Sequence, residues 1–291
     1  MNLQKIITLA NEAVRPQFEL MLETLRVSGC SLEVWVIPYD DKIFSLPHGC
    51  RWWLNDEIFE WLREHNCHPS MRKYLCLTTS EYQFVDTDVI FLRNPQEVLS
   101  PYSGFVTSCG HWRDTSHTCT RDSESLLKTK GERWKNEVFN SGQFACDIAL
   151  FNSESLKFQC EQAHYKPTCI DWPHNEQPGM NLLVGMSKIQ ITNLTLPPIS
   201  MRSTWAGDYP NQFPDNWEEP ERKPYLIHWA GLSYDLSREV DRMALAFIDK
   251  SQRSSLLNSR EKRTTIASKI ATVFNVIKAN IQKLKCPSNS R

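Results

Sequence analysis

Residues 82–95, YQFVDTDVIFLRNP, place two carboxylates two positions apart within an otherwise apolar run. The apolar flanks predict a buried strand of the parallel type, in which a charged side chain needs a compensating partner. Thr87 separates Asp86 from Asp88, so in an extended chain both side chains share one face and can converge on Mg²⁺ or Mn²⁺. The alternative is a strand that ends in a polar loop with two solvated aspartates. The flanks favour the metal site, because apolar residues continue on both sides of the pair.

The N-terminal part of the chain predicts a β-α-β unit. Residues 5–10 form an apolar run, residues 16–29 show a helical pattern that opens with proline, and residues 32–37 form the second expected strand. We therefore expect an α/β fold with a doubly wound, mostly parallel sheet flanked by helices. Ligands of such sheets bind at the carboxyl ends of the strands. The residues that this rule places at a nucleotide crevice are Ala10, Asn11 and Asp40.

The other expected elements follow from periodicity and turn residues. The predicted helices are residues 55–65 and 70–80, and the predicted strands are residues 104–108 and 144–151. Residues 111–135 have no clear period and predict an irregular segment. Residues 197–224, rich in Pro, Trp and Asn, predict an ordered loop near an acceptor site.

Composition predicts a globular enzyme. The chain has 291 residues, of which 41% are hydrophobic and 23% charged, and it contains no apolar run of 18 residues. Its first residues are too polar for a signal peptide, so we expect a cytoplasmic protein. The ten cysteines include no Cys-x-x-Cys pair, which favours reduced thiols over a disulfide framework.

The chain has a net charge of −1, but its charges are unevenly distributed along the sequence. Residues 251–291 hold nine Lys and Arg residues against one acidic residue, Glu261, so we expect a main domain over residues 1–250 and a basic tail over 251–291. Apolar residues in the tail recur at helical spacing and predict an amphipathic helix. Such a helix either covers the surface of its own domain or makes a peripheral contact with an anionic membrane.

Residues 82–95 resemble the Asp-x-Asp segment of the glycosyltransferase A-type fold, as found in nucleotide-diphospho-sugar transferases such as the glycogenin-like retaining families. Three more segments resemble that family in the expected order: residues 139–152 (FNSGQFACDIALFN), 175–184 (NEQPGMNLLV) and 226–231 (LIHWAG). The resemblance implies that Asp86, Asp88 and His228 hold a divalent metal against the donor diphosphate. It also implies that Asn140 and Gln177 face the donor sugar. The remaining residues expected to contact the donor are Thr87 and Gly231.

Two positions depart from the family pattern. Glycogenin-like relatives have a lysine shortly after the His-x-x-Gly segment, and here residues 232–234 are Leu, Ser and Tyr. The usual Asp-Gln pair is Glu176 and Gln177, which leaves the donor sugar open.

Several candidates have a second interpretation. Glu176 is either a nucleophile or base, or a solvated surface carboxylate. Lys73, together with Arg72, either contacts the phosphates or decorates a helix. Four tryptophans in irregular segments either stack on sugar rings or pack in the core; they are Trp112, Trp172, Trp205 and Trp217.

The sequence thus predicts a metal-dependent glycosyltransferase of the hexosyl type that uses a nucleotide-sugar donor, best matched by a UDP-sugar. The acceptor is expected to be a hydroxyl of a glycan, a lipid-linked molecule or a protein, with retention of anomeric configuration and no nucleic-acid partner. The alternative is a non-catalytic carbohydrate-binding or scaffold protein that keeps the fold. A nucleotidyltransferase fits less well, because the residues after the first predicted strand include no glycine.

Overall fold

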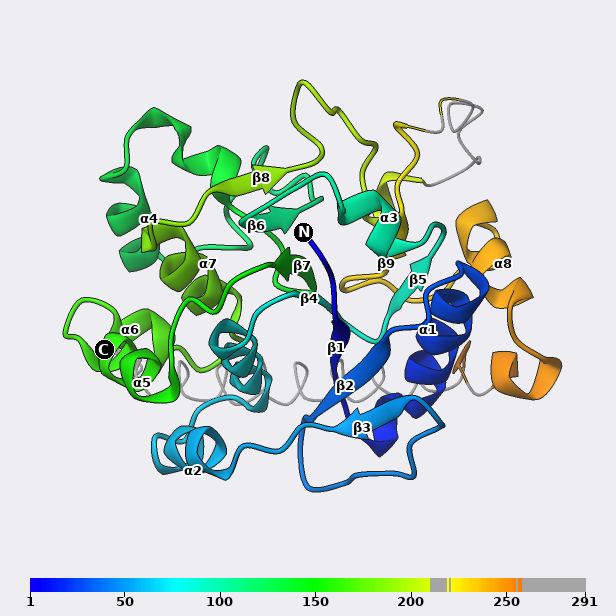
Figure 1. Cartoon of the computed structure of the whole chain (residues 1–291), viewed down its shortest axis with the longest axis horizontal. Helices are drawn as coiled ribbons and strands as arrows, with labels where there is room; N and C mark the ends of the chain where they lie inside the picture. Colours follow the sequence, from blue (N-terminus) through cyan, green and yellow to red (C-terminus); the bar gives the residue numbers. More distant parts are fainter. Residues whose placement is uncertain (210–218, 220, 255, 258–291) are drawn as a thin grey trace, which may run out of the picture. The chain divides into compact units, whose positions relative to one another are not determined.

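The computed structural model describes residues 1–209, 219, 221–254 and 256–257 (Figure 1). The chain divides into two units, Met1–Phe247 and a second that begins at Ile248. The predicted amphipathic tail helix lies outside the described residues, so the tail and its boundary at residue 250 stay predictions. Within the described part, no helix is both long and apolar enough to cross a membrane.

The first unit is built on one mixed sheet with the strand order β3-β2-β1-β4-β7-β6-β8. These strands are β1 (Lys5–Ala10), β2 (Glu33–Pro38), β3 (Cys50–Trp52), β4 (Tyr82–Val85), β6 (Phe105–Thr107), β7 (Gln143–Cys146) and β8 (Ile191–Asn193). Every pair of neighbours is parallel except those that involve β7, which runs antiparallel to both β4 and β6. The expected mostly parallel sheet is therefore confirmed, with one reversed strand inside it.

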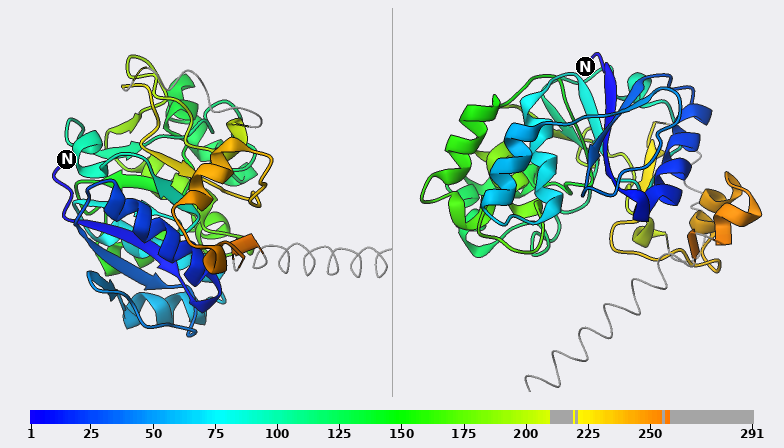
Figure 2. Two further views of the ribbon diagram at one scale, coloured as in Figure 1. Left: turned by 90° about the vertical axis from the view of Figure 1, so that its right-hand side faces the viewer. Right: turned by 90° about the horizontal axis from the view of Figure 1, so that it is seen from below.

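Helices cover both faces of this sheet, as the view from below in Figure 2 shows. On one face lie α2 (Asp56–Glu64), the 3₁₀ helix η2 (Pro69–Thr78), α5 (Ser153–Glu161), α6 (Lys166–Cys169) and α7 (Gln177–Met186). On the other lie α1 (Arg15–Val27) and α3 (Pro95–Leu99). β1 explains why both faces are apolar: Ile7 and Leu9 join the first core cluster, and Ile6 and Ala10 join the second.

The predicted strand over residues 82–95 is wrong in one respect. β4 ends at Val85, a turn carries both aspartates, and β5 (Val89–Phe91) then leaves the main sheet. β5 pairs antiparallel with β9 (Leu226–His228) in a separate two-stranded sheet, as Figure 1 shows. The apolar residues of β5 are buried as expected, but they pack with β9 and α1 on the second face of the main sheet.

Three other expectations need correction. Residues 111–135 are not irregular, because they contain α4 (Arg121–Lys128) and the start of η3 (Glu132–Glu137). The side chains of Thr120 and Ser123 cap α4 reciprocally. The strand expected over 144–151 ends at Cys146, and the helix expected over 70–80 is the 3₁₀ helix η2. The remaining described elements are η1 (Glu12–Val14), η4 (Ala206–Asp208) and α8 (Glu239–Ala246).

α7 packs closely against η2 because it carries Gly179. A Cβ at this position would overlap the hydroxyl of Tyr74 and lie 3.2 Å from Cα of Cys169. The Tyr74 hydroxyl is itself buried and donates to the carbonyl of Cys169 at 3.0 Å. The first turn of α7 therefore has a fixed place, which matters because the residues at its start reach the site described below.

We predict that Gly179→Ala lowers the free energy of unfolding by about 1–3 kcal/mol through overpacking. The matched control is Gly185→Ala in the same helix. Its Cβ would meet one side-chain methyl group of Leu127 and no backbone atom, and the alanine gains helix propensity worth up to about 1 kcal/mol. Denaturant unfolding of both variants measures the difference. Equal effects of the two substitutions would contradict the close packing at Tyr74.

Candidate metal centre

Three side chains from two distant segments of the chain meet beside the end of β4. Asp86 and Asp88 come from the turn between β4 and β5, and His228 is the last residue of β9. Nε2 of His228 lies 3.1 Å from Oδ1 of Asp88 and 3.8 Å from Oδ2 of Asp86. One ligand atom from each residue lies within 4.8 Å of the others. The predicted metal ligands therefore do come together, and two carboxylates with one imidazole form a set that Mn²⁺ accepts.

Backbone pairing produces this convergence. The register of β5 and β9 sets Val89 opposite His228, so the turn with the aspartates lies beside the end of β9. The Trp229 N–H donates to the carbonyl of Asp88 at 2.9 Å, and the His228 N–H donates to the carbonyl of Thr204 at 2.7 Å. The pairing that pulls β5 out of the main sheet is thus what brings the imidazole to the carboxylates.

Gly142 keeps the space beside the ligands open. Its carbonyl accepts the N–H of Asp86 at 2.8 Å, and its own N–H donates to Oδ1 of Asn140 at 2.7 Å. A Cβ on Gly142 would lie 2.6 Å from Oδ2 of Asp86 and would overlap Cε1 of His228. A side chain here would displace two ligands, so glycine at this position and the surrounding donor set both fit a divalent cation.

A buried lysine links one of the ligands to a third carboxylate. Nζ of Lys73 lies 2.8 Å from Oδ1 of Asp86 and 2.7 Å from Oε1 of Glu176. The side chains of Lys73 and Glu176 are each only 5% exposed. The Ser141 hydroxyl also donates to Oε1 of Glu176, at 2.7 Å. The interpretation of Glu176 as a solvated surface charge is therefore wrong, as is that of Lys73 as a helix decoration.

The pKa directions agree with this network. Burial acts to lower the pKa of Lys73, but Asp86 and Glu176 together hold it above its ordinary value. Burial raises the pKa of Asp86, against the opposing effect of Lys73. Burial also acts to raise the pKa of Glu176, yet Lys73 and the hydrogen bonds to its carboxylate bring it below the ordinary value. The lysine is thus charged and Glu176 ionised, which favours one fixed arrangement.

These residues line one pocket, which we call the metal pocket. Its lining residues are Lys73, Asp86, Asp88, Asn140, Ser141, Gly142, Asn175, Glu176, Gln177, His228, Ala230 and Gly231. Gln177 is held at both ends of its amide, because Oε1 accepts the N–H of Ser141 at 3.1 Å and Nε2 donates to the carbonyl of His117 at 2.6 Å. The residues predicted to face a sugar, Asn140 and Gln177, thus share a pocket with the metal ligands.

Three predicted nucleotide residues lie at the ends of β1 and β2 and do not line the metal pocket. Nδ2 of Asn11 donates to Oδ2 of Asp40 at 2.6 Å, which ties the two strand ends together. Ala10 is fully buried in the second core cluster. Asp40 lines a different pocket together with Arg72, whose guanidinium donates to the carbonyl of Pro38 at 2.7 Å.

The last two residues predicted to contact the donor are Thr87 and Gly231, and of these Gly231 lines the metal pocket. Thr87 is buried, at 8% exposed, and does not line the metal pocket. Gly231 lines it, with a φ of +70° in the left-handed region that favours glycine.

A second pocket adjoins the metal pocket, and most of its residues were not predicted from the sequence. Its lining residues are Gly110, His111, Arg113, Asp114, His117, Asn140, Gln177, Ser203, Trp205, Asp208, Ala230 and Gly231. Residues 111–117, HWRDTSH, could have indicated this pocket from the sequence, because they contain two imidazoles, a guanidinium and a carboxylate within seven positions. The pairing of this segment with Gln177 is long-range and leaves no local pattern.

The four candidate tryptophans have different surroundings in the structure. Trp205 lines the second pocket and is 40% exposed. Trp112 lies in the 111–117 segment but does not line this pocket, and it donates its Nε1–H to the hydroxyl of Thr195 at 3.1 Å. Trp172 packs against the first core cluster, and Trp217 lies outside the described residues.

Comparison with known proteins agrees with this geometry. Residues 77–243 match the family model for nucleotide-diphospho-sugar transferases. The chain is similar to the apo structure of WbbM, a bifunctional glycosyltransferase, at 14% identity and a TM-score of 0.53, over 86% of this chain and 50% of that one. It is also similar to an active-site mutant of LgtC, at 13% identity and a TM-score of 0.50, over 87% of this chain and all of that one. These structural likenesses show the fold alone, and the chain spans half the length of WbbM. A search of curated proteins gave no match.

We predict that Gly142→Ala weakens Mn²⁺ binding by about 10–100-fold, because the new methyl group displaces His228 and Asp86. Calorimetric titration with Mn²⁺ measures the effect. Gly110→Ala serves as the control, since the nearest atom to its Cβ would be 4.0 Å away. Unchanged Mn²⁺ affinity in Gly142→Ala would show that the cation does not lie among these ligands.

Proposed function

The chain belongs to the nucleotide-diphospho-sugar transferase family and has the glycosyltransferase A-type fold, and we propose that it moves a hexosyl group from a UDP-sugar to an acceptor hydroxyl. The observation that carries this proposal is the meeting of Asp86, Asp88 and His228 in a pocket that also holds Asn140 and Gln177. A scaffold protein has no need for such a set of converging metal ligands. No observation on the site favours that alternative.

The charge around the ligands suits a divalent cation bound to a diphosphate. When all three carboxylates are ionised, Asp86, Asp88 and Glu176 carry three negative charges against one positive charge on Lys73, so the ionised cluster has a net charge of about −2. Asp86, Asp88 and His228 would hold Mn²⁺ or Mg²⁺, which when bound neutralises charge on a diphosphate leaving group. The ion pair with Lys73 keeps the Asp86 carboxylate in place before any donor arrives.

Because the lysine that follows the His-x-x-Gly segment in glycogenin-like relatives is absent here, diphosphate binding depends more strongly on the metal ligands. Residues 232–234 replace it, and Tyr234 packs its ring against Trp229 with 5.2 Å between ring centroids. Among the described residues that line the metal pocket, Lys73 is the sole Lys or Arg. It is already held by Asp86 and Glu176. We therefore infer that diphosphate binding depends on the metal ligands more than on a dedicated phosphate cation.

The proposed roles of the other residues follow from their contacts. Asn140 and Gln177 orient the donor sugar from the wall that both pockets share. Gln177 is the better fixed of the two, because Ser141 and His117 hold both ends of its amide. Oε1 of Glu176 already accepts two hydrogen bonds, so we assign Glu176 to holding Lys73 and not to attack on the sugar.

The proposed reaction breaks the bond between the sugar C1 and the β-phosphate oxygen and forms a bond between C1 and the acceptor oxygen. The acceptor proton leaves with the UDP. We propose retention of configuration, with the leaving phosphate oxygen taking that proton, because the carboxylates of the metal pocket are engaged as ligands or with Lys73. Proton NMR of the anomeric position of the first product tests this choice, and an inverted product would overturn it.

The whole proposal is tested by incubating the protein with a panel of UDP- and GDP-hexoses, with and without Mn²⁺. We expect Mn²⁺-dependent release of UDP from one UDP-sugar. Asp88→Asn should reduce this release by at least about 100-fold, because the cation loses a charged ligand where charge develops.

Asp122→Asn is the matched control for this test. Asp122 lies exposed in the first turn of α4, away from both pockets, and its substitution removes the same charge. Donor turnover that is absent with every sugar, or equal in the two variants, would contradict the proposed function.

A further inference from the structure

The second pocket contains an indole that is held rigidly and still presents surface. Trp205 donates its Nε1–H to the carbonyl of Ala230 at 3.1 Å. A Cβ on Gly207 would overlap the six-membered ring of Trp205, so the ring packs directly against the backbone of η4. Even so, Trp205 is 40% exposed. A large aromatic side chain that is fixed by its polar edge and by backbone, yet open to a pocket, is suited to ligand contact.

This indole is tied to the metal centre through the backbone. Trp205 forms an isolated parallel bridge with His228, and the carbonyl of Thr204 accepts the His228 N–H at 2.7 Å. Ala230, which accepts the indole N–H, lies two residues after the metal ligand and lines both pockets. The position of the ring is therefore set by the same segment that sets the imidazole.

The two pockets share one wall. Asn140, Gln177, Ala230 and Gly231 line both of them. A molecule in the second pocket would therefore lie beside a donor sugar that is held by Asn140 and Gln177. The second pocket is thus in the position that an acceptor needs for attack on that sugar.

Polar groups surround the indole and suit hydroxyl recognition. His111, Asp114, His117, Ser203 and Asp208 all line the pocket. Burial lowers the pKa of His111 to about 4, so its imidazole is neutral and can donate one hydrogen bond and accept another. A mixture of neutral and charged donors and acceptors around an aromatic face matches a ring that carries several hydroxyl groups.

We propose that the second pocket binds the acceptor, that this acceptor is a saccharide, and that a pyranose ring stacks on the indole of Trp205. This inference rests on the proposed function and specifies the acceptor class for the same site. Trp205 determines acceptor specificity in this account, and His111 and Asp208 contact the hydroxyl groups of the ring.

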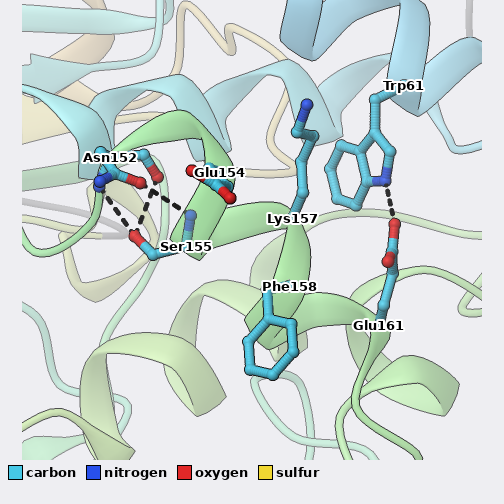
Figure 3. Close-up of a pocket in the computed structure, with 7 residues that line it drawn as sticks. All are labelled: Trp61, Asn152, Glu154, Ser155, Lys157, Phe158 and Glu161. Atoms are coloured by element: carbon cyan, nitrogen blue, oxygen red, sulfur yellow. Dashed lines mark hydrogen bonds between the residues drawn. The ribbon is translucent and has the colours of Figure 1, made fainter.

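Another aromatic depression provides a comparison. Trp61, Asn152, Glu154, Ser155, Lys157, Phe158 and Glu161 line it, between α2 and α5 (Figure 3). There the Trp61 indole donates to Oε1 of Glu161 at 2.7 Å, and Phe158 is 66% exposed. This depression shares no lining residue with the metal pocket. Phe158→Ala therefore removes an exposed aromatic ring without touching the proposed acceptor site.

The test measures transfer and hydrolysis of the donor in one assay. The probes are the accepted UDP-sugar, Mn²⁺ and octyl pyranosides of the gluco, galacto, manno and xylo series, with water as the competing acceptor. We expect the wild-type protein to transfer to at least one pyranoside. Trp205→Ala should lower the ratio of transfer to hydrolysis at least about tenfold, mainly through the KM for the acceptor. Trp205→Phe keeps an aromatic face and should keep most of that ratio.

The outcomes separate the two proposals. Absence of both hydrolysis and transfer in the wild-type protein overturns the proposed function. Hydrolysis without transfer to any pyranoside, or an unchanged ratio in Trp205→Ala, overturns the saccharide inference and leaves the function standing. An equal loss in Phe158→Ala also overturns it. A loss specific to Trp205→Ala that Trp205→Phe restores supports the stacked pyranose.

Discussion

The buried ion pairs of Lys73 with Asp86 and Glu176 hold the site together. Lys73 lies in η2, Asp86 lies in the turn after β4, and Glu176 lies immediately before α7. A buried charge without a partner destabilises a fold strongly, so each of these segments is constrained by the other two. Lys73 therefore holds both the metal ligand Asp86 and the start of α7 in position. Gln177, the first residue of α7, takes its place at the shared wall of the two pockets for this reason.

A second constraint comes from β5 and β9. Their pairing brings His228 to the aspartates, and the continuation of β9 carries Ala230 and the support for the Trp205 indole. The metal ligands and the proposed acceptor platform thus depend on one short piece of sheet. This arrangement places the two pockets, and with them the proposed donor and acceptor sites, side by side although their residues come from distant parts of the chain.

The sequence predicted the features that a local pattern controls. The apolar flanks of Asp86 and Asp88 pointed to a metal-ligand pair, and the run over residues 5–10 predicted β1 with the bounds that the structure shows. The sequence could not show that β5 leaves the main sheet, because an apolar run does not specify its partner strand. It also could not show that Glu176 is buried, since that depends on Lys73, which lies about 100 residues away. α4 was missed because it is only eight residues long and holds two apolar residues, Leu126 and Leu127.

The central claim is that one divalent cation binds among Asp86, Asp88 and His228 and holds the donor diphosphate. Anomalous diffraction from crystals grown with Mn²⁺ and UDP tests it most directly. We expect a manganese peak within coordination distance of all three side chains and of the diphosphate oxygens. A manganese peak elsewhere, or UDP bound with no metal at these ligands, would contradict it.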